Sequence, residues 1–162
     1  MVKIQNWLKD SIREIKGYEL IYRATVHGDS NDVSFQMCKN KHNLLWLMKD
    51  KNNNIFGCFH SIPIYSDKSY CKDTKCFLFS VNKNKKYNPN LQIQKNMYNC
   101  PSHLIEFGDG EKNVWEFNVG DKFLSINSVN FQNGAVFNHQ NEISYNNINV
   151  SLSELEVFRV IY

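Results

Sequence analysis

Residues 44–48 (LLWLM) and 55–62 (IFGCFHSI) are two apolar runs, separated by the consecutive asparagines Asn52, Asn53 and Asn54. Apolar runs of this length, rich in aromatic residues and bounded by turn-forming residues, are typical of buried strands. Asparagine favours turns because its short polar side chain tolerates a left-handed backbone. The stretch therefore predicts an antiparallel hairpin that contributes two strands to the core.

Short runs of the same kind recur along most of the chain, at residues 19–25, 76–81, 91–94, 103–107, 114–117, 122–126, 129–131 and 154–161. Asn133-Gly134 stands between alternating apolar residues, a pattern that predicts a tight two-residue turn. Many short strands joined by polar turns predict a mainly β fold with a few helices, built as a two-sheet antiparallel β-sandwich.

Two segments show helical rather than strand patterns. Apolar residues recur at spacings of three and four over residues 2–16, which predicts an amphipathic N-terminal helix that ends at Gly17. Ser30 or Asn31 is suited to begin a shorter helix that runs to about Cys38. We therefore divide the chain into an N-terminal helix over residues 1–17, packed on or preceding the domain, and a sandwich domain over residues 18–162.

The composition limits the classes of function. The 162 residues suit one domain, and the 23 asparagines fit polar turns between strands. A net charge of +3 is too small for a dedicated nucleic-acid binder. The charge is uneven, however, with seven lysines against one aspartate in residues 68–95 and five acidic residues against one lysine in residues 106–121. Such a surface can orient a protein partner, although two ordinary solvated loops are the alternative.

The chain has the sequence features of a cytoplasmic protein. No run approaches the roughly 20 apolar residues of a membrane span, and residues 1–17 carry too many charges for a secretory signal. The five cysteines are therefore expected to be thiols in a reducing compartment.

The sequence contains no cofactor-binding fingerprint or complete metal-binding pattern, so we expect neither a cofactor nor a metal. Two thiol sites remain as candidates. Cys58 and His60 are two apart on a predicted strand and share a face, which permits a thiolate–imidazole pair. Cys71 and Cys76 lie among lysines that would favour a peroxide-reactive thiolate.

The order of several segments resembles the TLDc domain family, from about residue 18 to the end. The segments that carry the resemblance are 20–24 (LIYRA) with 27–30 (HGDS), 55–59 (IFGCF), 75–80 (KCFLFS), 107–111 (FGDGE), Trp115, 120–121 (GD) and 155–158 (LEVF). Asp109 interrupts the glycine run of the family, and Cys58 and Phe59 replace its usual second glycine and aromatic residue.

The resemblance implies a β-sandwich flanked by helices and a non-enzymatic protein-interaction module. It also implies a role in protection against oxidative stress and, for some members, binding to subunits of the vacuolar proton-pumping ATPase. The loop residues that it marks for partner binding are Gly108, Gly110, Glu111, Gly120 and Asp121.

Two other functions stay open from the residues. One is a thiol-dependent peroxidase or small hydrolase that uses Cys58 with His60, or Cys71 or Cys76. The other is carbohydrate recognition by exposed aromatic side chains, because 22 of the residues are aromatic.

Overall fold

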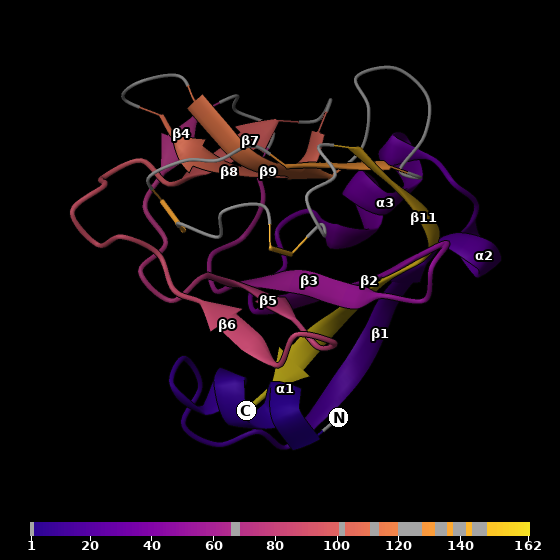
Figure 1. The fold of residues 1–162 in the computed structure, drawn as a ribbon, viewed down its shortest axis with the longest axis horizontal. Helices are drawn as coiled ribbons and strands as arrows, with labels where there is room; N and C mark the ends of the chain where they lie inside the picture. The colour runs from indigo at the N-terminus through magenta and orange to yellow at the C-terminus, as the bar shows by residue number, and fades with distance from the viewer. Residues whose placement is uncertain are drawn as a thin grey trace.

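The computed structural model describes residues 2–65, 69–100, 103–110, 114–119, 128–131, 136–137, 142–143 and 149–162. It confirms the predicted two-sheet antiparallel β-sandwich with a few helices (Figure 1). The elements in chain order are α1 (Val2–Lys9), β1 (Gly17–Arg23), α2 (Ala24–His27), α3 (Asn31–Cys38), β2 (Leu44–Asp50), β3 (Ile55–His60), β4 (Tyr70–Cys71), β5 (Phe77–Ser80), β6 (Lys85–Tyr87), β7 (Met97–Cys100), β8 (His103–Asp109), β9 (Val114–Val119), β10 (Ser128–Phe131) and β11 (Asn149–Ile161).

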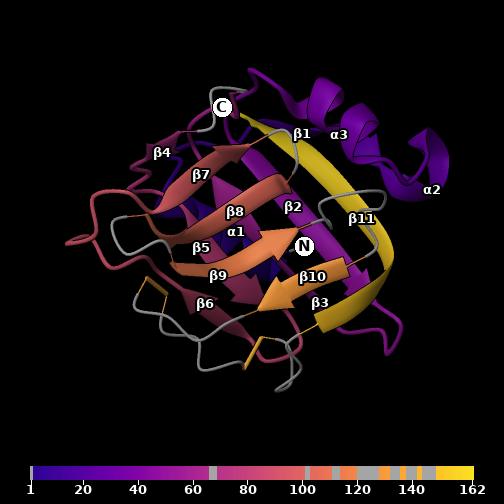
Figure 2. The same ribbon diagram turned by 90° about the horizontal axis from the view of Figure 1, so that it is seen from above.

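The long strand β11 belongs to both sheets. Its first residues pair with β10, in the upper sheet of Figure 1, which has the order β4-β7-β8-β9-β10-β11. From Leu152 onward it pairs with β2, with an irregularity between Leu152 and Glu154, and from Glu156 onward it also pairs with β1 on its other side. These pairings belong to the lower sheet, which has the order β1-β11-β2-β3-β5-β6. Figure 2, which looks onto the upper sheet, shows β11 passing along its edge. One strand thereby joins the two layers.

The hairpin predicted from the two apolar runs is confirmed. β2 and β3 pair antiparallel, from Leu44 opposite His60 to Lys49 opposite Ile55. In the turn, Asn53 has a φ of 64°, the left-handed conformation for which asparagine is suited. The Asp50 carboxylate accepts hydrogen bonds from the backbone N–H groups of Asn52 and Asn54, both at 2.8 Å, and so fixes the turn.

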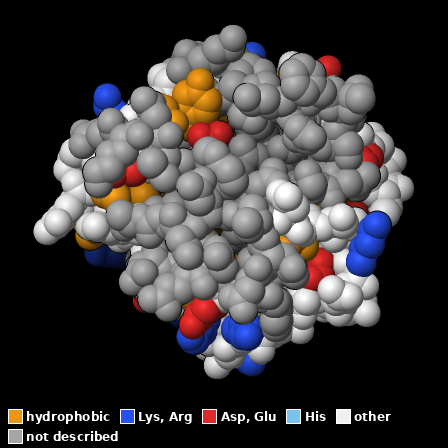
Figure 3. Space-filling model, turned by 45° about the horizontal axis from the view of Figure 1, so that its top comes forward, with side chains coloured by type: hydrophobic (Ala, Val, Ile, Leu, Met, Phe, Trp, Pro, Cys, Tyr) orange, Lys and Arg blue, Asp and Glu red, His pale blue; other side chains and the backbone are white. Residues whose placement is uncertain are grey.

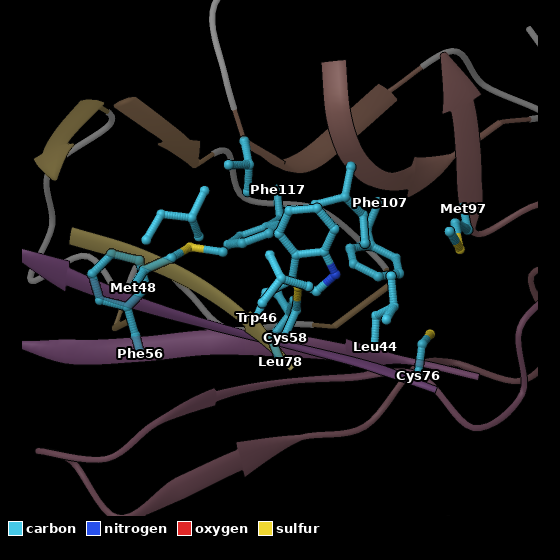
Figure 4. Close-up of a cluster of buried hydrophobic side chains, with 14 of the residues drawn as sticks. Leu44, Trp46, Met48, Phe56, Cys58, Cys76, Leu78, Met97, Phe107 and Phe117 are labelled. Carbon is cyan, nitrogen blue, oxygen red and sulfur yellow. The ribbon is translucent and has the colours of Figure 1, made fainter. Parts of the chain in front are cut away.

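The main core lies between the two sheets (Figure 4). Trp46, Cys58 and Leu78 rise from the lower sheet toward Phe107 and Phe117 of the upper sheet, and all five are fully buried. This large apolar contact supplies the main driving force for folding.

A second apolar cluster covers the outer face of the lower sheet. Ile4 and Leu8 of α1, with Ile12 just after it, pack against sheet residues that include Phe59 and Phe79. The side chain of Lys86, about 10% exposed, donates hydrogen bonds to the Trp7 carbonyl at 2.9 Å and to the Asp10 carboxylate at 2.8 Å. The N-terminal helix is thus packed on the sandwich.

Several elements differ from the sequence-based predictions, and β1 ends at Arg23 rather than at residue 25 because α2 begins at Ala24. α1 ends at Lys9 rather than at residue 16, and Gly17 begins β1, because Lys16 N–H already bonds to the Ile161 carbonyl at 2.8 Å. Residues 91–94 form a turn rather than a strand, since the Asn90 carbonyl and side chain accept the N–H groups of Ile93 and Gln92.

The sequence did not predict α2, β4, β6 or β7, and it began the last strand at residue 154, whereas β11 begins at Asn149. The short helix predicted to follow Ser30 is confirmed as α3, Asn31–Cys38. The predicted strand at residues 122–126 and the predicted turn at Asn133-Gly134 lie outside the described residues. No described helix is long and apolar enough to cross a membrane.

Candidate functional site

Two lysine-bearing loops lie side by side at the ends of the sheets, one over residues 72–76 and the other over residues 90–96. We call them the basic loop pair. The Lys72 ammonium group donates to the Leu91 carbonyl and to the Gln94 side chain, each at 2.9 Å. Asp73 N–H donates to Asn96 Oδ1, and Asn96 Nδ2 returns a bond to the Asp73 carbonyl, both at 2.8 Å. These contacts fix the two loops relative to each other.

A buried carboxylate anchors the first loop to the sandwich. Asp73 is 1% exposed, and its two oxygens accept bonds from Ser61 N–H at 2.6 Å, Ser61 hydroxyl at 2.7 Å and Lys75 N–H at 2.9 Å. Ile62 N–H adds a longer contact of 3.4 Å. Ser61 directly follows β3, so Asp73 ties the loop to the lower sheet, while Asn96 directly precedes β7 of the upper sheet. A buried charge held by several donors is well compensated.

The outer surface of the basic loop pair combines positive charge with an apolar side chain. The residues Lys75 and Lys95 are exposed, and Leu91 is 57% exposed. Lys75 and Leu91 border a cleft of about 300 Å³, and its full lining is Asp10, Ser11, Thr74, Lys75, Cys76, Lys86, Asn88, Pro89 and Leu91. A rigid surface of this composition suits contact with an acidic protein surface, since rim charges steer encounter and an apolar anchor adds affinity.

The sequence predicted a surface with a basic region from residues 68–95 and an acidic region from residues 106–121. The acidic part of this prediction is wrong for the residues that the structure describes there. Glu106 and Asp109, from the acidic segment, are 7% and 5% exposed and therefore do not form an acidic face. Glu106 instead lies near Tyr70, whose pKa is raised by burial first and by this neighbouring charge second. Where Figure 3 shows described surface, basic and acidic side chains lie next to one another near its lower edge.

The loop glycines marked by the family resemblance hold backbone in place. Gly108 is buried in β8, where its N–H bonds to the Asn96 carbonyl at 3.2 Å. Gly110 N–H bonds to the Lys95 carbonyl at 2.8 Å, and a Cβ there would lie 2.4 Å from the Tyr70 ring. Both glycines thus support the second loop of the basic loop pair.

The remaining residues of that predicted partner-binding set, Glu111, Gly120 and Asp121, lie outside the described residues. Partner binding by the five residues therefore stays a prediction. In the described residues, Gly108 and Gly110 bind the backbone carbonyls of Asn96 and Lys95.

Cys58 and His60 share the inner face of β3, as the spacing predicts, and both are fully buried. Burial raises the pKa of the Cys58 thiol well above its usual value, which disfavours the reactive thiolate. Burial also lowers the pKa of His60 to about 4, although the bond from its Nδ1 to the Ile62 carbonyl at 2.6 Å and the charge of Asp73 act in the opposite direction. The pair has neither access to solvent nor an activated nucleophile.

The two cysteines of the lysine-rich segment differ from each other. Cys76 is buried, its Sγ–H donates to the Asp73 carbonyl at 3.2 Å, and burial raises its pKa. Cys71 is half-buried, and its Sγ–H donates to the Met97 carbonyl at 3.5 Å. In the described part of the chain, His, Cys, Asp and Glu residues form no group of three that could hold a metal ion.

Sequence reasoning missed the polar centre of this site, Ser61, Asp73 and Asn96. Each stands in a polar loop where serine, aspartate and asparagine are ordinary residues. The one signal was the solitary position of Asp73 among the lysines of residues 68–95.

The fold and this site define an antiparallel β-sandwich domain with an N-terminal helix on its outer face and an anchored basic loop pair at one end. The family model for the TLDc domain matches residues 1–161, and the chain belongs to this family. The match includes the N-terminal helix, which the motif resemblance left out. A search of curated proteins finds no match to the chain.

Proposed function

We propose that this protein is a non-enzymatic interaction module that acts in the cytoplasm in protection against oxidative stress, and that its partners are subunits of the vacuolar proton-pumping ATPase. Membership of the TLDc family is the observation that carries this proposal. Fold alone does not specify a partner, so the surface chemistry supplies the second argument.

The basic loop pair is the surface we assign to the partner. Its lysines project from loops that Asp73 and Asn96 fix to both sheets, so little ordering is needed on binding. Lys75 in the first loop and Lys95 in the second loop are exposed and carry positive charge. Leu91, in the second loop, adds an exposed apolar side chain. The complementary partner surface is acidic.

Affinity capture from cytosol tests the proposal, with recovery of proton-pump subunits as the readout. The variant Lys75→Glu/Lys95→Glu reverses two charges on the basic loop pair. Its matched control, Lys49→Glu/Lys51→Glu, changes the net charge equally at two exposed lysines, one near the end of β2 and one in the turn that follows. We expect the first variant to reduce capture at least tenfold, corresponding to about 1.4 kcal/mol, and the control to retain it.

Reproducible capture of no proton-pump subunit by the unaltered protein would exclude the proposed partner. Equal loss of capture in both variants would exclude the basic loop pair as the specific surface, because a general charge effect would then explain the result.

The thiol-dependent alternative predicts a different result. Among Cys38, Cys58, Cys71 and Cys76, Cys71 alone is not fully buried, so peroxide turnover through these four thiols should disappear in Cys71→Ser. An interaction module should show no peroxide turnover and should keep partner capture in the same variant.

A further inference from the structure

The cleft that borders the basic loop pair has walls from three parts of the chain, and hydrogen bonds join these walls to one another. The Ser11 hydroxyl, just after α1, donates to the Lys75 carbonyl in the first loop at 3.0 Å. The Lys86 ammonium group on β6 donates to the Asp10 carboxylate at 2.8 Å, so the third wall is joined to the same segment. Because its walls are joined in this way, the cleft is formed before a partner binds, and little ordering is needed on binding.

Three side chains of the lining carry hydrogen-bond donors that have no partner among the residues that the structure describes. They are the Thr74 hydroxyl, the Lys75 ammonium group and the Asn88 amide, and all three side chains are exposed. The one carboxylate of the lining, that of Asp10, is already bound by Lys86. The cleft therefore offers donors and positive charge to a ligand, and these are complementary to a carboxylate.

The same lining also includes apolar surface. Leu91 is 57% exposed, and Pro89 lies in the lining with it. A free anion would leave this surface in water, whereas a peptide with an apolar side chain next to its carboxylate would cover it. The volume of about 300 Å³ is at the lower end of the range for small-molecule pockets, roughly 300–1,000 Å³. The cleft thus fits one or two side chains of a peptide better than a free anion or a large ligand.

We propose that the cleft binds an acidic segment of the protein partner. A glutamate or aspartate carboxylate of this segment accepts hydrogen bonds from Lys75 and Thr74, and a neighbouring apolar side chain packs on Leu91. The inference rests on the proposed function for the presence of a protein partner at the basic loop pair, and it adds the chemistry by which that partner is recognised. The bond from Lys75 contributes more than the bond from Thr74, because a hydrogen bond between two charged groups is roughly twice as strong as a neutral one.

A synthetic nonapeptide tests the inference. Its central leucine is flanked by glutamates, and glycine and serine fill its neutral, capped ends. We would titrate this acidic peptide into the full chain and follow the backbone amide resonances of Thr74, Lys75 and Leu91 by NMR. We expect a dissociation constant of about 1 mM or tighter. The peptide with glutamine in place of each glutamate should bind roughly tenfold more weakly, and so should the peptide with serine in place of leucine.

Three outcomes of these titrations would overturn the inference. One is unchanged resonances with the acidic peptide at roughly 10 mM. Another is equal binding of the acidic peptide and its glutamine counterpart, because recognition would then not depend on the carboxylate. The third is binding of free glutarate as tightly as the acidic peptide, because the apolar contact with Leu91 would then add nothing.

Variants of the protein assign the contacts. Lys75→Gln should weaken binding of the acidic peptide about tenfold, and Leu91→Ser should weaken it about fivefold. Both side chains are exposed, so both variants should fold. The matched control is Lys51→Gln, which removes the same charge at an exposed lysine of the β2–β3 turn and should retain binding. Equal weakening by Lys75→Gln and Lys51→Gln would overturn the assignment of the cleft.

The peptide titration and the affinity capture fail separately. Capture of proton-pump subunits by a protein that does not bind the acidic peptide would overturn the inference and leave the proposed function standing. Binding of the acidic peptide by a protein that captures no proton-pump subunit would support the inference and exclude only the named partner.

Discussion

Asp73 is the residue on which the candidate site most depends. Its two carboxylate oxygens accept hydrogen bonds from Ser61 and Lys75, and its backbone exchanges two more with Asn96. In the unfolded chain water hydrates this carboxylate, and in the folded protein these fixed donors take the place of the water. Loss of any one of these donors or acceptors leaves a polar group unpaired in the interior.

We therefore predict that Asp73→Asn lowers the free energy of unfolding by about 3 kcal/mol. The amide keeps one acceptor oxygen, but its NH2 group is itself a donor and faces donors that the second carboxylate oxygen had accepted. Asp32→Asn, at an exposed position in the first turn of α3, is the matched control and should cost less than about 1 kcal/mol. Urea denaturation measures both. Equal, small losses would show that the buried carboxylate contributes no more than a surface one.

At the scale of the element, α1 depends on contacts made by other parts of the chain. Isolated helices of eight residues are not stable in water. Ile4 and Leu8 supply the buried apolar face, and Lys86 binds the Trp7 carbonyl near the helix end, where carbonyl groups lack helical partners. The amphipathic pattern predicted a helix here, but it did not indicate that the helix ends at Lys9.

We predict that Lys86→Met frays α1 and lowers the free energy of unfolding by about 2 kcal/mol, because the ammonium group is mostly buried and cannot be replaced by water without rearrangement. Hydrogen exchange of residues 2–12 should accelerate. Lys85→Met removes an ion pair with Glu142 in which the lysine side chain is 53% exposed, and it should change stability by less than about 1 kcal/mol. Unchanged exchange of α1 in Lys86→Met would contradict the assigned role.

At the scale of the whole molecule, the buried His60 links folding to pH. Burial lowers its pKa in the folded state to about 4, whereas an unfolded histidine has a pKa of about 6.5. The unfolded chain therefore binds more protons between these two values. The stabilising contribution of neutral His60 is fully present above pH 6.5 and is lost as the pH falls toward 4.

We predict that this single group removes roughly 3 kcal/mol of stability between about pH 6.5 and pH 4. His60→Asn keeps a donor for the Ile62 carbonyl but does not titrate, so its stability should fall less steeply over the same range. Denaturant titrations at several pH values measure the two slopes. Parallel slopes for both proteins would mean that other groups carry the pH dependence.

Prediction from sequence succeeded where the signal was local. The β2–β3 hairpin follows from two apolar runs and asparagines that accept a left-handed backbone. The predicted α3 forms as well, with Ser30 at its N-terminus but without a capping hydrogen bond from the Ser30 side chain. It failed where a nearby side chain or a distant strand supplied the hydrogen-bond partner of the backbone. Asn90 draws Gln92 and Ile93 into a turn, and β1 begins at Gly17 because β11 lies beside it.

The sequence by itself determined the β-sandwich class, the family and the presence of an amphipathic N-terminal helix, because strand and helix periodicities are properties of consecutive residues. Only the tertiary structure decided which polar residues matter. Ser61, Asp73 and Asn96 meet from separate loops, Glu106 and Asp109 turn inward, and Cys58 and His60 become inaccessible. Burial and pairing depend on contacts between distant segments, and these alone separate a surface charge from an internal anchor.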